Sequence, residues 1–165
     1  MSAPVARADV PVEATWDLRD LFADEAAWEA EFQAVDAARD AMAAFQGRLG
    51  HDAATLLAGL DAFETLSARL MRVMVFAYLR NAQDATHPPH QAAVARVSAL
   101  QARVEAATSF VESEILALPE DVLQALRAAE PGLAEFNVML DDLLALRPHR
   151  LGASSTSPSA NSFNG

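Results

Sequence analysis

The chain has 165 residues and a formal net charge of −11, and all of its basic residues are arginines. The sequence contains no basic stripe that could displace counterions from a nucleic acid or bind an anionic membrane surface. Nucleic acids and membranes are therefore excluded as partners. The absence of cysteine excludes disulfides, thiolate metal sites and a cysteine nucleophile. Because 52% of the residues are hydrophobic and 37 are alanine, we expect an all-α protein with a sizeable core.

The N-terminal sequence MSAPVARADVPVEATW lacks the apolar stretch of a secretory signal. No stretch of about 18 residues is free of charge, so no transmembrane helix is predicted. We therefore expect a soluble, cytoplasmic protein.

The N-terminal part is predicted to contain one long helix after an irregular start. Residues 1–14 lack a periodic pattern and are expected to form an extended lead-in, and WDLRDLF (16–22) to form a short helical turn. Asp24 is a suitable N-cap for a helix over about residues 25–45. Apolar residues recur along this helix at steps of three and four, which predicts one buried face: Trp28, Phe32, Val35, Ala38, Met42 and Phe45.

Two helices of about 30 residues are predicted in the middle of the chain, over residues 53–83 and 89–117. Asp52 is the expected N-cap of the first, and the prolines of THPPH (86–90) separate the two. Because the connection is short, the helices must form an antiparallel hairpin. The apolar stripe of the first helix contains Leu56, Leu60, Phe63, Leu66, Leu70, Val73, Met74 and Ala77.

Two shorter helices are expected after the hairpin. Pro119 begins the first, and EPG (130–132) precedes the second, which is predicted over about residues 133–146. The expected architecture is a helical domain over residues 15–150, in which the N-terminal helix and the two C-terminal helices pack on the long hairpin. Residues 151–165 are predicted to be a flexible, serine-rich tail.

The sequence gives no sign of catalytic or metal-binding residues. The HExxH pattern of zinc peptidases does not occur. The members of each carboxylate pair are expected on different helix faces, and no serine has a histidine nearby in helical register. In HPPH (87–90), the prolines are expected to prevent the helical geometry that would direct both histidines to one ion, so a solvated turn is predicted. Asp84 and His87 form a D-x-x-H pair, but the further ligands of a di-iron bundle are missing.

Tyr78 and Arg80 stand out in the run FAYLRN on the second long helix. The first interpretation is packing of the ring and of the aliphatic part of the arginine, with the guanidinium in solvent. The alternative is that both residues line a ligand groove.

Four clusters occur in an order and at a spacing that resemble a known family. They are WDLRDLF followed by Trp28 and FQGRL (45–49), FAYLRNAQD (76–84), SFVESEILALPED (109–121) and LDDLLALRPHRL (140–151). Over residues 15–151 the chain resembles the N-terminal domain of oligoendopeptidase F, a zinc metallopeptidase of the thimet-oligopeptidase type.

The resemblance implies an almost wholly helical fold, and a longer catalytic domain that encloses a channel for short peptides together with this one. It also implies that the zinc ligands and the catalytic glutamate belong to that catalytic domain, so no catalytic residue and no cofactor is assigned to this chain. Alone it is expected to be inactive. The candidate groove or interdomain contacts are Tyr78, Arg80, Arg147 and His149.

The sequence departs from the family pattern after RPHRL (147–151), where an uncharged, serine-rich stretch replaces the expected glutamates. A frameshift, a fragment boundary and a genuine linker all fit this composition. A large apolar patch, formed by the last helix and one side of residues 56–77, is expected to be exposed and to favour self-association. The alternative function is a free-standing acidic helical module that binds a partner protein, and a third is a bundle that binds a small ligand or metal.

Overall fold

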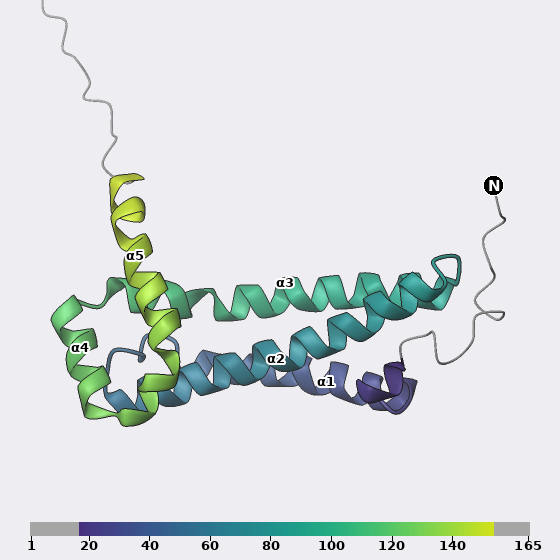
Figure 1. The fold of residues 1–165 in the computed structure, drawn as a ribbon, viewed down its shortest axis with the longest axis horizontal. Coiled ribbons are helices and arrows are strands. Elements are labelled where there is room, and N and C mark those ends of the chain that lie inside the picture. Colours follow the sequence, from purple (N-terminus) through teal and green to yellow (C-terminus); the bar gives the residue numbers. More distant parts are fainter. Residues whose placement is uncertain (1–16, 154–165) are drawn as a thin grey trace, which may run out of the picture. The chain divides into compact units, whose positions relative to one another are not determined.

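Figure 1 shows the fold in a computed structural model that describes residues 17–153, with side chains described for residues 17–145. Helices are the only regular elements of residues 17–153, so the predicted all-α class is confirmed. The described residues form two compact units. The first contains residues 17–46 and 61–109, and the second contains residues 47–60 and 110–153.

The two longest helices are α2 (Ala53–Gln83) and α3 (Pro88–Ala117), with the predicted short connection between them. The Asp52 carboxylate accepts a hydrogen bond of 2.7 Å from the Thr55 backbone N–H, as expected of an N-cap. Pro88 and the proline after it occupy the first turn of α3, where a missing N–H costs nothing. In the first unit, α2 and α3 therefore run in opposite directions, as Figure 1 shows.

Helix α1 (Glu25–Ala41) completes the first unit by burying one face against α2 and α3. Trp28 is 3% exposed, and its indole N–H donates a hydrogen bond of 3.0 Å to the backbone oxygen of Val73 on α2. Four aromatic rings lie next to one another in a row in space, with 5.3 to 6.2 Å between the centroids of neighbouring rings. Their order is Phe22, Phe76, Trp28 and Phe32. We call these four residues the aromatic row.

Ion pairs connect the acidic residues of α1 to arginines of both other helices. Glu31 lies 2.6 Å from Arg69 of α2, measured from Oε1 to Nε. On α3, Arg96 and Arg103 pair with Glu29 and Asp36, at 2.7 and 3.1 Å. Both pairs with α3 have the same sequence separation of 67 residues, which shows that α1 and α3 run parallel.

We expect the free energy of unfolding to fall as the pH drops through the range where these carboxylates titrate. Arg96 and Arg69 hold the pKa values of Glu29 and Glu31 below the ordinary value of 4.5. Each carboxylate therefore stabilises the fold fully above pH 4.5, and that contribution is lost as the pH falls through its lowered pKa. Urea unfolding measured across acidic pH should show a smaller loss for the E29Q/E31Q double variant than for the parent chain.

The control for this pH effect is Glu64→Gln, which removes one exposed glutamate that has no ion pair among the described residues. If E64Q flattened the pH dependence as much as the double variant did, the two ion pairs would not be its cause.

The second unit begins with the turn after the 3₁₀ helix η4 (Met42–Ala44), where Gly47 has a positive φ of 76°. The Glu114 carboxylate of α3 accepts hydrogen bonds from the backbone N–H groups of Gly47 and Leu49, at 2.5 and 3.3 Å. One glutamate therefore holds this turn against the C-terminal end of α3.

The rest of the second unit consists of α4 (Glu120–Ala129), the 3₁₀ helix η5 (Pro131–Phe136) and α5 (Asn137–Ala153). The Arg127 side chain joins α4 to α5, because it donates to the Asn137 side-chain oxygen and to the Asp141 carboxylate. Fully buried side chains come from every helical segment of the unit: Leu56, Leu60, Ile115, Leu123, Leu133 and Leu140.

The last helix differs from its prediction in both type and position. The segment that begins at Pro131 is a 3₁₀ helix, where the Glu130 side chain accepts from the Gly132 N–H at 3.1 Å. The α-helical part begins only at Asn137, and its backbone continues to Ala153. The expected lead-in (1–14) lies outside the described residues, and so do residues 154–165 of the expected tail (151–165). Residues 151–153 belong to α5 instead, because the helix continues past the predicted start of the tail.

Candidate functional site

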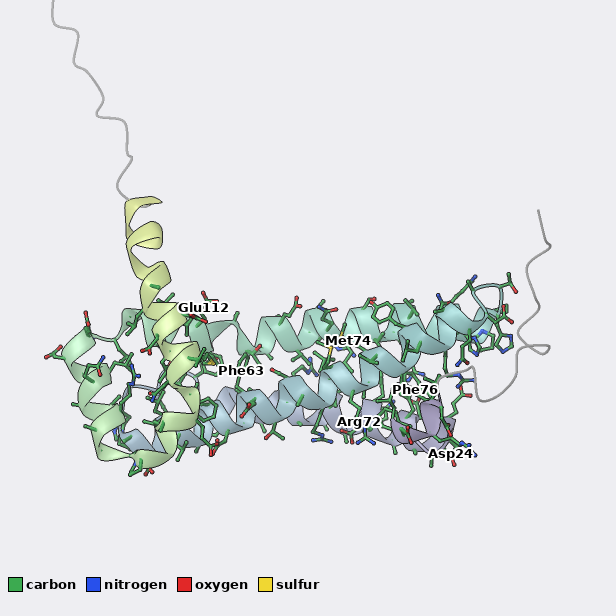
Figure 2. All side chains as sticks on the ribbon, in the orientation of Figure 1. Asp24, Phe63, Arg72, Met74, Phe76 and Glu112 are labelled. Atoms are coloured by element: carbon green, nitrogen blue, oxygen red, sulfur yellow. The ribbon has the colours of Figure 1, made fainter. Side chains whose placement is uncertain are left out.

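Tyr78 lies at the surface of α2, on the side that faces α3. Its side chain is 43% exposed, and its hydroxyl lies 3.3 Å from the Ser98 hydroxyl of α3. Met71 and Met74 precede it by seven and four residues, so the three share one side of the helix, and Met71 is 59% exposed. Figure 2 shows Met74 on the side of α2 toward α3. We call Met71, Met74 and Tyr78 the α2 stripe.

Arg80 lies on a different side of α2 and faces α1. Its Nη1 is 3.0 Å from the Glu25 carboxylate, and its guanidinium lies 5.6 Å from the centre of the Phe76 ring. Residues two apart on a helix point about 200° apart, so the structure does not bring Tyr78 and Arg80 together. The contacts of Arg80 fit the packing interpretation, and its role in a groove stays a prediction. The other two candidate contacts, Arg147 and His149, belong to the part of α5 whose side chains lie outside the described residues.

Each of the two units exposes large apolar side chains, and the expected large patch stays a prediction. In the first unit, Met71 and Tyr78 of the α2 stripe are exposed. In the second unit, Val138 of α5 is 74% exposed. These residues belong to the two helices for which exposure was expected, and each gives its own unit an apolar contact point.

The HPPH turn has a geometry that the sequence did not predict. The prolines lie inside the first helical turn of α3, and the rings of His87 and His90 meet edge to face with centroids 4.4 Å apart. Prolines at this position therefore do not prevent helical geometry, because first-turn residues need no intrahelical N–H donor. The His90 Nδ1 lies 3.2 Å from the Asp84 backbone oxygen, so the pair is tied to the turn itself.

A zinc site does not fit the side chains that the structure describes. Among residues 17–145, no three histidine, aspartate or glutamate side chains gather as metal ligands. The donor set of a catalytic zinc, three protein ligands around an open position, is therefore not available within this region.

The sequence also left the contacts of the arginines with the aromatic row unpredicted. The Arg96 guanidinium lies 4.4 Å from the centre of the Phe32 ring and 5.3 Å from that of Trp28. Arg72 lies 4.5 Å above the Phe22 ring and donates a hydrogen bond to the Leu21 backbone oxygen. The spacing of Glu29 and Asp36, seven residues apart like Arg96 and Arg103, could have identified the two ion pairs, but the sequence carries no comparable signal for the ring contacts.

The described helices form an all-α protein, in which arginine ion pairs connect α1 to α2 and α3, and α2 and α5 carry exposed apolar residues. Comparison with known proteins identifies its relatives. A family model described as Oligopeptidase F, for the N-terminal region of these peptidases, matches residues 114–155. The chain is 30% identical over 145 residues to Oligopeptidase PepF of Bacillus subtilis (strain 168), and 32% identical over 145 residues to Group B oligopeptidase PepB of Streptococcus agalactiae serotype III (strain NEM316).

Both alignments cover 88% of this chain. The fold is also that of a solved structure, oligoendopeptidase-F from Enterococcus faecium, with a TM-score of 0.71 and 24% identity over 76% of this chain and 25% of that one. The chain is therefore related to the N-terminal domain of oligoendopeptidase F-like peptidases, and the resemblance seen in the sequence is confirmed. It spans 22% and 24% of the length of the two curated relatives.

No helix within residues 17–153 combines the length and the apolar character needed to cross a membrane.

Proposed function

We propose that this chain acts as the substrate-confining N-terminal domain of a zinc oligopeptidase that hydrolyses short peptides. The observation that carries the proposal is the similarity to two oligopeptidases along 88% of the chain. Its partner would be a catalytic domain that supplies the zinc and the residues that activate water. The sequence itself has no HExxH, so we expect no hydrolysis by the chain alone.

The exposed positions of the described helices support a role in contact with a further domain. Met71 and Val138 are more than half exposed, although large apolar side chains normally gain free energy from burial. Covering such residues is what a domain interface does. The lack of cysteine also fits the cytoplasmic location that we propose, because small secreted domains are often held by disulfides.

A chimeric enzyme tests this function. The matching N-terminal region of Bacillus subtilis Oligopeptidase PepF is replaced by this chain, and hydrolysis of a fluorogenic short peptide is measured beside that of an unfolded protein. We expect the chimera to cleave the peptide and to spare the protein, because the helical domain restricts access to the catalytic centre.

The control is the same enzyme with its N-terminal region deleted. A chimera no more active than this deletion variant, although folded by circular dichroism, would contradict the proposed function. That outcome would favour the alternative of an acidic helical module with another partner, for which the exposed α2 stripe is the first surface to examine.

A further inference from the structure

A surface hollow of about 430 Å³ lies in the first unit, where the 3₁₀ helix η3 (Leu18–Asp20), the first turn of α1 and the last turns of α2 meet. Its volume falls within the range of small-molecule pockets, roughly 300–1,000 Å³. Figure 2 shows two of its lining residues, Asp24 and Phe76, at the same end of this unit. Neither Tyr78 nor the α2 stripe takes part in it.

The floor of the hollow is apolar and held in place. Leu18, Phe22 and Phe76 line it, and the two rings meet edge to face at 5.3 Å between centroids. Both phenylalanines are almost buried, because Arg72 covers the first ring and Trp28 stacks on the second. An apolar side chain bound there would meet a surface that needs no rearrangement.

The rim of the hollow carries both signs of charge. Arg19, Arg80, Asp24 and Glu25 all line the hollow. The Arg19 guanidinium is paired with Asp17, and the Asp24 carboxylate caps α1 by accepting from the Ala27 N–H, so Arg80 and Glu25 are the charges that a ligand would meet. Glu25 is 66% exposed, so its ion pair with Arg80 is of the solvated kind that contributes little and exchanges easily. Gln83 adds an amide whose side chain makes no hydrogen bond within residues 17–145.

This combination discriminates between classes of ligand. A purely anionic ligand would face the two carboxylates, and a purely cationic one would face the two guanidinium groups, and each repulsion costs binding free energy. A zwitterion can pair its carboxylate with Arg80 and its ammonium with Glu25, because both residues line the same hollow. The apolar floor then selects a zwitterion that also carries an apolar side chain.

We propose that the hollow bounded by Arg80, Glu25 and the Phe22–Phe76 floor binds an amino acid or a dipeptide that has both termini free and an apolar side chain. Binding there does not depend on the peptidase function proposed above, since every contact comes from residues 18–83 of this chain.

The test titrates the full chain with small ligands and follows its ¹⁵N–¹H amide spectrum. L-leucine and L-leucyl-L-leucine are the probes, and the relative affinity of the two distinguishes an amino-acid site from a dipeptide site. N-acetyl-L-leucine lacks the ammonium, L-leucinamide lacks the carboxylate, and glycine lacks the side chain. We expect saturable shifts around residues 18–25 and 76–83 with the complete zwitterions, and binding about tenfold weaker or worse for each incomplete ligand.

Arg80→Gln should weaken binding of the zwitterions about tenfold or more, because a hydrogen bond to a charged group is lost. Arg103→Gln is the matched control: it removes an arginine that also pairs with a carboxylate of α1, but that does not line the hollow. Circular dichroism verifies that both variants fold. Equal binding of the acetylated, amidated and free ligands, or no saturable shift with any of them, would overturn the proposal whatever the variants do.

Discussion

Trp28→Ala lowers the free energy of unfolding by about 3–5 kcal/mol, the usual cost of removing a buried large aromatic side chain. Trp28 is 3% exposed and lies within the aromatic row, with Phe76 and Phe32 at 6.2 and 5.6 Å between ring centroids. The loss of its indole leaves a cavity where α1 meets α2, and it also exposes the partner rings. Urea unfolding followed by far-ultraviolet circular dichroism measures the change.

Trp28→Phe is the matched variant for this prediction. It keeps an aromatic ring in place but removes the N–H that donates to the Val73 backbone oxygen. That oxygen belongs to an α2 peptide group and keeps its helical partner, so we expect a smaller cost of about 1–2 kcal/mol. If the alanine variant cost no more than the phenylalanine variant, the aromatic row would not be the centre of this unit's core.

Local signals in the sequence predicted the helices of the hairpin well. The bounds of α2, Ala53–Gln83, were predicted because Asp52 is an N-cap and because prolines follow the helix. The start of α3 was displaced by one residue, since Pro88 itself can occupy the first helical turn. Helix ends are set by groups within a few residues, and such groups are visible in a sequence.

The last helix shows where local reasoning fails. Apolar spacing over residues 133–146 suggested one α-helix, but the start of this segment is a 3₁₀ helix capped by the Glu130 side chain. Apolar residues spaced three positions apart fit both kinds of helix, because a 3₁₀ turn contains three residues and an α turn contains 3.6. The pattern alone could not distinguish them.

The candidate site was less accessible to prediction than the fold. Tyr78 and Arg80 are neighbours in the sequence, but they contact different helices, α3 and α1. The partner of each residue lies 20 or more positions away, so no local pattern could assign it. The family, in contrast, was recognisable because four clusters kept their order along the chain, which needs no knowledge of contacts.

Loss of the Glu114 carboxylate is the second substitution for which we expect a large loss of stability, because this carboxylate connects residues of the second unit that are distant in sequence. We expect Glu114→Ala to lower the free energy of unfolding by about 2–3 kcal/mol, the range for losing hydrogen bonds to a charged group. Its two oxygens accept from the N–H groups of Gly47 and Leu49, which lie 67 and 65 residues earlier in the chain. Thermal and urea unfolding of the variant measure the loss.

Glu114→Gln separates the charge of the carboxylate from its geometry, because the amide keeps one acceptor oxygen. About half of the loss should remain in this variant, since neutral hydrogen bonds are roughly half as strong as charge-assisted ones. Glu105→Ala is the matched control on α3. Among the described side chains its carboxylate accepts only from Gln101, one turn away, so the variant should cost no more than about 0.5 kcal/mol. Equal losses for E114A and E105A would contradict the prediction, because they would mean that the backbone alone holds the turn around Gly47. The positive φ of Gly47 would then be the feature that defines this turn, in place of the distant carboxylate.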